Sequence, residues 1–369
     1  MPRSILVLNV AALSPWEVVE EDCPRLHALS TLGGLHPLQA PEPALTSTSH
    51  ATMLTGLEPR EHGVIANGWY EASHGRVFNW NRSDRMVVGE KIWEAASRAH
   101  PGFKTANLFW RFCTHGDCNL TLTERPTYFS NGRKGADVYS SSPAFRTSCI
   151  DDLGPFPFFH FWGPKAGLPS TQWIVDAARK CLREVGPNLL LCYAPGLDYE
   201  VQRAGPKADS TRAVLREADG VFSPLLDDAI ASGMDVAVVS DYGFTTVSKP
   251  VFLNRALRER GFLAVEDAAN GELLEPGASR AFAVCDNQAA HVYVRDHADI
   301  EAVRTCLNEM PGVREVVGPD ALASPCLGHA RSGQLLAVAE PECWFAYPYW
   351  LTPEKAPDFA RCVDIFNKP

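Results

Sequence analysis

The sequence predicts an α/β fold in which a mostly parallel central sheet is flanked by helices on both faces. Short, largely apolar runs alternate with longer amphipathic helical patterns, which is the arrangement of a parallel sheet buried on both sides. The chain has 369 residues, of which 46% are hydrophobic, so it can form one large domain with a sizeable core. No internal repeat or low-complexity segment indicates a different architecture.

The strands and helices of this fold follow from the local patterns. Four short runs rich in β-branched and apolar residues are predicted as core strands: Ile5–Val10, Thr105–Trp110, Asn188–Ala194 and Val236–Ser240. The clearest helical patterns are Val88–Arg98, Thr171–Val185, Ser210–Ala231 and Asn254–Arg260. Helices of this kind are the usual connections between parallel strands.

Two segments interrupt this alternation. Residues 113–165 are rich in Gly, Pro, Ser and aromatic residues, which is typical of a lid or binding loop, although the aromatics are equally consistent with packing. Residues 262–318 combine strand and helix patterns at Ala281–Cys285, His291–Val294, Ile300–Met310 and Val313–Val317. We therefore expect an α/β core made of residues 1–261 and 319–369, with 262–318 as a small inserted α+β subdomain that caps it.

The composition argues against several function classes. The net charge is −10 and no long run of like charges occurs, so we expect no nucleic-acid partner. The first apolar run is too short for a signal sequence, and no segment is long and apolar enough to span a membrane, so we expect a cytoplasmic protein without a membrane anchor. The eleven cysteines are scattered singly, which favours reduced buried thiols. A homo-oligomer is compatible with the sequence, which leaves the oligomeric state open.

A cluster of hydroxyl side chains stands where a helix is expected to begin. Residues 46–50 read TSTSH and precede an apolar-periodic run that ends at Gly56. The first N–H groups of a helix lack intrahelical partners and the helix dipole is positive there, so this position can hold a phosphoryl group while a hydroxyl attacks it. We expect Thr46 to be that hydroxyl. An ordinary Ser/Thr cap followed by a surface turn would give the same local pattern.

Polar residues follow three of the predicted strands. Asn9 stands at the end of the first run, Asp198 lies just beyond the third and Asp241 follows the fourth. In sheets of this class the ligand lies beyond the carboxyl ends of the strands. These three residues therefore indicate the same site as the Thr46 segment.

The segment TSTSHATMLTGLEPREHGVIANGWY, residues 46–70, resembles the nucleophile segment of the nucleotide pyrophosphatase/phosphodiesterase branch of the alkaline phosphatase superfamily. The match in residue type, order and spacing covers about 25 positions, which is fairly specific for a motif. The resemblance implies that Thr46 is the nucleophile and that Asn67 contacts the phosphoryl oxygens. It also implies an alkaline phosphatase-like fold and a small anionic phosphate ester or diester as substrate.

Members of the family that the sequence resembles hold two metal ions, usually zinc. The ions lower the pKa of the threonine and neutralise the phosphoryl oxygens during in-line displacement. By this resemblance Asp198 and Asp241 stand on metal-ligand positions, and Thr46 is a further ligand. The resemblance thus implies a divalent-metal cofactor.

Other ligand positions depart from the family pattern. Asn9 stands where an aspartate is expected, and Gln202, Tyr242 and Phe366 stand where histidines are expected. Zinc prefers Cys and His ligands, so this set does not favour tight binding of two zinc ions. An oxygen-rich set could instead hold one hard ion such as magnesium, manganese or calcium; its members are Asp198, Asp241, Asn9, Gln202 and Thr46.

The leading hypothesis is a phosphoryl-transfer hydrolase of the phosphodiesterase/nucleotide pyrophosphatase type. Thr46 would attack phosphorus, Asn67 and the N–H after the nucleophile would hold the oxyanion, and Asp198 and Asp241 would carry the metal. Two alternatives stay open: a metal-depleted relative that binds an anionic small molecule without hydrolysing it, and a transferase to an acceptor alcohol. In a metal-free pocket an arginine would replace the ions, and the candidates are Arg60, Arg111, Arg203 and Arg331.

Overall fold

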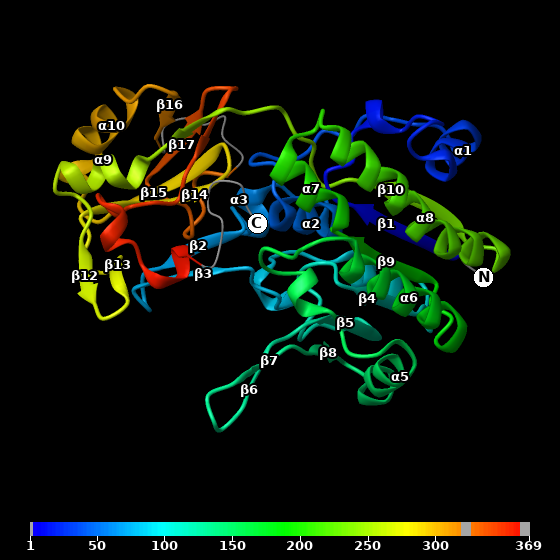
Figure 1. The fold of residues 1–369 in the computed structure, drawn as a ribbon. Coiled ribbons are helices and arrows are strands. Elements are labelled where there is room, and N and C mark those ends of the chain that lie inside the picture. Colours follow the sequence, from blue (N-terminus) through cyan, green and yellow to red (C-terminus); the bar gives the residue numbers. More distant parts are fainter. Residues whose placement is uncertain (1–2, 319–325, 362–369) are drawn as a thin grey trace.

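The structure is a computed structural model that describes residues 3–318 and 326–361. Its largest sheet has six strands in the order β10-β1-β9-β4-β5-β8 (Figure 1). The strands are β1 (Ile5–Val10), β4 (Thr105–Leu108), β5 (Leu120–Glu124), β8 (Val138–Ser140), β9 (Leu189–Ala194) and β10 (Asp235–Val239). All neighbours are parallel except β5 and β8. The expected mostly parallel central sheet is confirmed.

Helices cover both faces of this sheet. They are α1 (Pro24–Gly33), α2 (Thr46–Thr55), α3 (Pro59–His62), α4 (Ile92–Ala99), α5 (Pro143–Leu153), α6 (Leu168–Glu184), α7 (Gly196–Ala204) and α8 (Asp209–Ala231). Successive side chains of a strand point to opposite faces. Leu6 and Leu8 of β1 accordingly share a core with α6 and α8, whereas Ile5 and Val7 pack in the core that contains α2. The helix that carries Thr46 therefore lies on the face opposite α6 and α8.

A second, antiparallel sheet lies beside the first (Figure 1). Its order is β14-β15-β17-β16, with β14 (Ala281–Asp286), β15 (Ala289–Val294), β16 (Val313–Val317) and β17 (Leu335–Ala339), and α9 (Leu253–Glu259) and α10 (Ile300–Asn308) accompany it. The sheet takes in β17 from beyond residue 318, because this apolar strand pairs between β15 and β16. The division of the chain at 262–318 stays a proposal.

Part of the segment 113–165 forms regular structure, although it was expected to be rich in loops. β5 and β8 belong to the central sheet, and every residue of β5 is buried. Two of the segment's aromatic side chains, Phe156 and Phe161, are buried against Phe109. These two rings therefore serve packing.

The remaining short strands form four pairs, which are β2 (Gly68–Glu71) with β3 (Arg76–Asn79), β6 (Thr127–Tyr128) with β7 (Lys134–Gly135), β11 (Lys249–Val251) with β18 (Cys343–Phe345), and β12 (Val265–Ala268) with β13 (Gly271–Leu274). In the part of the chain that the structure describes, no helix has the length and apolarity of a membrane span. The ten cysteines within that part are free thiols, as expected.

Two buried imidazoles make the stability of the fold sensitive to acid. His62 accepts the Val64 N–H at Nδ1 (3.1 Å), and His291 accepts the Gly333 N–H at Nδ1 (3.3 Å). Burial lowers the pKa of each ring to about 4. The unfolded chain, with a histidine pKa near ~6.5, therefore binds more protons than the folded chain as the solution is acidified. The two neutral imidazoles therefore contribute their full stability above the unfolded pKa, and this contribution is lost as the pH falls toward 4.

We expect the free energy of unfolding to fall by about 2 kcal/mol for each of these imidazoles between about pH 6.5 and pH 5. Urea unfolding of the full chain at a series of pH values measures this slope. The variants His62→Asn and His291→Asn should each show a shallower slope than the unaltered protein. If both variants kept the original slope, the two rings would not be its source.

Candidate active site

α2 begins at Thr46, as the hydroxyl cluster predicts. Leu45 precedes the helix in an extended conformation, and its N–H donates to Thr48 Oγ1 at 3.3 Å. The helix ends at Gly56, whose φ of 72° lies in the left-handed region that glycine adopts without strain. Thr46 therefore occupies the first helical position, and its side chain lies on the wall of a cavity of about 1110 Å³.

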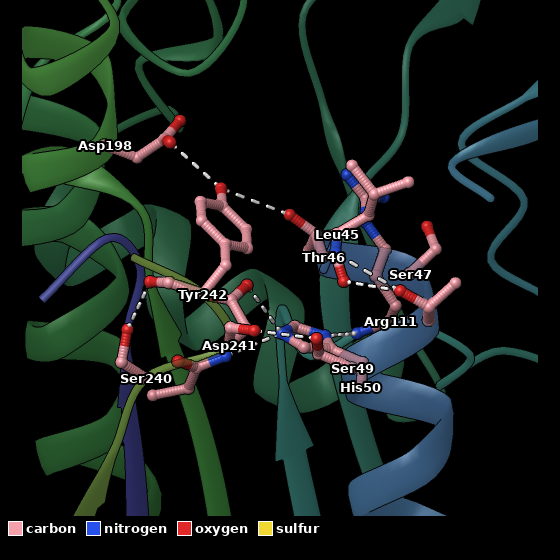
Figure 2. A network of polar contacts seen from close by, with 12 residues as sticks. Leu45, Thr46, Ser47, Ser49, His50, Arg111, Asp198, Ser240, Asp241 and Tyr242 are labelled. Atoms are coloured by element: carbon pink, nitrogen blue, oxygen red, sulfur yellow. Dashed lines mark hydrogen bonds and ion pairs between the residues drawn. The ribbon is translucent and has the colours of Figure 1, made fainter. Parts of the chain in front are cut away.

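A chain of hydrogen bonds joins Thr46 to Asp198 through Tyr242. The Thr46 hydroxyl donates to the Tyr242 hydroxyl at 3.4 Å, and Tyr242 donates to Asp198 Oδ1 at 2.9 Å. Figure 2 shows Tyr242 between the other two side chains. Burial, reinforced by the negative charges of Asp198 and Asp241, raises the pKa of Tyr242 well above its usual value, so the phenol keeps its proton at neutral pH.

Gln202 binds the other oxygen of the same carboxylate. Its Nε2 donates to Asp198 Oδ2 at 2.5 Å, because four residues of helix α7 bring the two side chains onto one face. Both oxygens of Asp198 thus accept hydrogen bonds from residues that stand on expected histidine positions. In the structure Gln202 and Tyr242 act as hydrogen-bond donors to Asp198.

Asn9 and Asp241 meet His50 behind the cavity wall. Asn9 Nδ2 lies 2.7 Å from His50 Nε2, and Asp241 Oδ2 lies 3.5 Å from the same nitrogen. His50 Nδ1 accepts the Arg111 N–H at 3.0 Å. A neutral imidazole accepts at only one nitrogen, so Nε2 carries the proton and faces Asn9 and the carboxylate of Asp241. Burial lowers the pKa of His50, although Asp241 acts in the opposite direction.

This arrangement separates the expected site residues into two groups. Asn9 and Asp241 are almost completely buried and do not belong to the cavity wall, whereas the wall includes Thr46, Asn67, Asp198, Gln202 and Tyr242. Apart from His50 Nε2 at 3.5 Å, neither oxygen of Asp241 has a polar side-chain or backbone partner within hydrogen-bond distance among the described residues. Phe366 lies outside the described residues. The residues predicted to converge at the edge of the sheet therefore form a group that lines the cavity and a group that lies behind it.

Asn67 is held in place by a residue that the sequence did not single out. The Ser47 N–H donates to Asn67 Oδ1 at 3.1 Å, which fixes the amide against the start of α2. Asp286, at the end of β14, accepts hydrogen bonds from the Asn67 N–H (2.9 Å) and from Nδ2 (3.1 Å). The only sequence signal for Asp286 is an acidic residue at the end of an apolar strand pattern in the second sheet.

The four candidate arginines have different surroundings. Arg111 is buried, lines the cavity and donates from Nη1 to Glu124 Oε1 at 2.9 Å. Arg203 also lines the cavity, but it is exposed and paired with Glu200. Arg60 is exposed, and Arg331 is committed to the backbone carbonyls of Gly63 and Met86. Arg111 is therefore the candidate whose position is that of a buried cation beside the cavity.

The donor set does not fit the two-zinc centre of the family. Among the described residues, no three His, Cys, Asp or Glu side chains form a group that could hold a metal ion. Both oxygens of Asp198 already accept hydrogen bonds, and neutral Tyr242 is a poor metal ligand. Apart from His50 Nε2, the carboxylate of Asp241 has no partner within hydrogen-bond distance in the described part of the chain, which is compatible with a single hard ion.

We expect protein purified without chelator to contain far fewer than two zinc ions per chain. The reason is that zinc sites combine three or four imidazole, thiolate or carboxylate ligands, and the described residues bring no such group of three together. Elemental analysis by inductively coupled plasma mass spectrometry measures the content. A value near two zinc ions per chain would contradict this conclusion about the donor set.

Comparison with known proteins agrees with this fold. Phosphonoacetate hydrolase from Sinorhizobium meliloti, solved with phosphonoacetate, has a TM-score of 0.67 and 17% identity, covering 96% of this chain and 84% of that one. Murine ectonucleotide pyrophosphatase/phosphodiesterase 5, solved as an inactive threonine-to-alanine variant with AMP, has a TM-score of 0.63 and 15% identity, covering 96% and 82%. These similarities confirm the alkaline phosphatase-like fold.

Sequence comparison identifies the family. The Saccharomyces cerevisiae ectonucleotide pyrophosphatase/phosphodiesterase 1 is 22% identical over 274 residues, which cover 66% of this chain and 34% of that protein. The chain thus spans about a third of the length of this curated relative. A family model described as type I phosphodiesterase/nucleotide pyrophosphatase matches residues 6–361. The chain therefore belongs to the type I phosphodiesterase/nucleotide pyrophosphatase family of the alkaline phosphatase superfamily.

Proposed function

We propose that this chain hydrolyses a small anionic phosphate ester or diester, with Thr46 as the nucleophile. The observation that carries the proposal is the Thr46 hydroxyl at the first turn of α2, on the cavity wall and hydrogen-bonded to Tyr242. The start of a helix favours an anion at this position. Membership of a family named for phosphodiesterase activity supports the reaction, and the inactive threonine-to-alanine variant of the murine neighbour supports a threonine nucleophile.

The hydrogen bonds supply a route for the proton of the nucleophile. Thr46 donates to Tyr242, which donates to Asp198, so Tyr242 would pass a proton to Asp198 as it receives one from Thr46. Asp198 would thereby act as a general base through the phenol. The Thr46 Oγ1–phosphorus bond would form as the bond to the leaving oxygen breaks. Water would then cleave the phosphothreonine and restore the hydroxyl.

Asn67 would hold an oxygen of the phosphoryl group. Its Nδ2 carries two hydrogens, of which Asp286 accepts one, so the second would bind the substrate. The Ser47 N–H, which follows the nucleophile, donates to Asn67 Oδ1. The Ser47 N–H would have to break its hydrogen bond to Asn67 Oδ1 before it could donate to the oxyanion.

A single divalent ion remains part of the proposal. By the family resemblance Asp241, Asn9 and Thr46 would be its ligands and a magnesium or manganese ion would supply positive charge, but Asp241 and Asn9 lie behind the cavity wall, so the ion would require side chains to move. Titration with manganese, followed by electron paramagnetic resonance, would detect the ion, with Asp241→Asn as the control variant. Cytoplasmic localisation and a homo-oligomeric state likewise remain predictions.

The test of the function is turnover of bis-p-nitrophenyl phosphate and of dinucleotides by the full chain and by Thr46→Ala. Equal rates for the two proteins would overturn the proposal. Product analysis with candidate alcohols present would show whether water or an alcohol accepts the phosphoryl group, and a phosphorylated alcohol would favour the transferase alternative.

A second candidate function is binding of an anionic small molecule without hydrolysis. The observation in its favour is that Asp198, a metal ligand by family resemblance, is fully engaged by Gln202 and Tyr242. Absence of turnover together with saturable binding of AMP by the purified chain would support this candidate. Turnover that depends on Thr46 would exclude it.

A further inference from the structure

Phosphoryl transfer requires positive charge beside the phosphoryl oxygens, and the donors around Asp198 do not fit the zinc ions that supply this charge in the family. We propose that the guanidinium of Arg111 supplies it by binding the phosphoryl oxygens of the substrate directly. This inference rests on the proposed function and adds a catalytic residue to it.

The backbone around Arg111 is strained and held by buried rings. Arg111 follows β4 by three residues, at the carboxyl end of the strand. Phe109 and Phe112 have φ values of 63° and 60°, a region that bulky residues rarely adopt because it is strained. Both rings are buried, and the Arg111 N–H donates to His50 Nδ1 at 3.0 Å. The chain thus holds Arg111 in one conformation although its backbone is costly.

The charges around Arg111 do not cancel. Arg111 Nη1 lies 2.9 Å from Glu124 Oε1, and Arg82 Nε lies 3.1 Å from the same oxygen. Although burial alone would raise it, the two guanidiniums hold the pKa of Glu124 below its ordinary value, so its carboxylate is ionised at neutral pH. Two positive charges therefore share one negative charge. Glu124 alone therefore does not neutralise both guanidiniums, and Arg111 keeps positive charge on a wall that also carries the carboxylates of Asp198 and Asp286.

Arg111 also has a nitrogen without an acceptor. The side chain is only 4% exposed, and its Nε is buried and makes no hydrogen bond. The guanidinium lies over the Trp80 ring, 5.0 Å from its centroid. The backbone N–H of Trp80 donates to the backbone carbonyl of Asn67 at 2.8 Å. Trp80 thereby connects Arg111 to the residue proposed to hold the oxyanion. Because the Nε atoms of Arg25 and Arg304 are likewise buried without a partner, the position of Arg111 on the cavity wall, and not this nitrogen, distinguishes it.

The other arginines on the cavity wall do not offer the same chemistry. In the described part of the chain the wall also includes Arg203 and Arg314, and both are exposed and paired with carboxylates. Interactions of exposed pairs are weakened by solvent and salt. Arg111, by contrast, acts from a buried position, where its interaction with a bound phosphate is stronger.

The test compares Arg111→Gln with Arg82→Gln in the full chain. Each variant removes one guanidinium from Glu124, but Arg82 is not part of the cavity wall. With bis-p-nitrophenyl phosphate we expect Arg111→Gln to lower kcat by about 10³-fold, as removal of a charge-stabilising arginine does in other phosphoryl transfers. Arg82→Gln also removes a positive charge from Glu124 but takes no group from the cavity wall, so it should lower kcat far less, by at most about 10-fold. Equal losses in the two variants would assign Arg111 a structural role and overturn the inference.

Binding of inorganic phosphate separates this inference from the proposed function. In the Thr46→Ala background, where no covalent intermediate can form, isothermal titration should show phosphate binding at least about 10-fold weaker after Arg111→Gln. Arg111→Lys should recover part of the affinity, because it restores the charge without the planar fork. Unchanged phosphate affinity in Arg111→Gln would refute the role of Arg111 even if Thr46 proves essential. Arg111-dependent phosphate binding without any turnover would instead refute the hydrolase proposal alone.

Discussion

Replacement of Thr46 by alanine is expected to lower kcat on bis-p-nitrophenyl phosphate by at least about 10³-fold, because it removes the nucleophile itself. The fold should survive. The side chain is small, and its hydrogen bond to Tyr242 is long, at 3.4 Å. A stopped assay with high protein concentration is needed to measure the residual rate, and thermal unfolding should show that the variant is folded.

Thr46→Ser is the matched control for this variant. Serine keeps the hydroxyl at the first turn of α2, so it should retain most of the activity, within about 30-fold of the unaltered protein. Trapping of a phosphorylated residue by rapid acid quench should succeed with threonine or serine at this position and fail with alanine. A Thr46→Ala variant that still formed the phosphorylated protein would place the nucleophile elsewhere.

Restoration of two family ligands is expected to create zinc affinity. The double variant Asn9→Asp and Tyr242→His would surround the carboxylate of Asp241 with a second carboxylate and an imidazole, next to the Thr46 hydroxyl. We expect zinc to bind at least about 100-fold more tightly than to the unaltered chain, since direct ligands matter more than the outer-shell partners that change affinity 10- to 100-fold. Competition with a chromogenic chelator measures the affinity.

Thermal unfolding provides a second measurement of the same variant. Without zinc, the added carboxylate beside Asp241 should lower the melting temperature, because two buried like charges repel each other. Saturating zinc should reverse this loss. Each single variant should gain less affinity than the pair, and a pair that binds no more zinc than the unaltered chain would show that the ligand positions inferred from the family do not converge here.

The fold and the position of Thr46 could be predicted from local patterns, whereas Asn67, Gln202 and Tyr242 were expected at the site only through the family resemblance. β1 has its predicted bounds, since a short apolar run beside the N-terminus can only be a core strand in this pattern. Thr46 lies at the start of its helix because the hydroxyl cluster and Gly56 mark the two ends. The segment 113–165 was harder to interpret, since β5 alternates Leu and Thr and is nevertheless buried throughout.

The contacts within the site could not be predicted in the same way. That Tyr242 bridges Thr46 and Asp198 depends on the rotamer of a single ring. That Asp286 binds Asn67 depends on how the second sheet docks, and no local pattern encodes a contact between residues 219 positions apart. Arg111 was one of four equivalent candidates until the fold buried it beside Glu124.

The contact between Asp286 and Asn67 has a consequence for how this protein can be divided or recombined. A chimera whose β14 region came from a relative without an acidic residue at position 286 would keep Thr46. The side chain of Asn67 would then lose its acceptor and could change its orientation. Truncation before that strand should have the same effect. The position of the Asn67 side chain therefore depends on β14, so the two regions of the chain would have to be exchanged together.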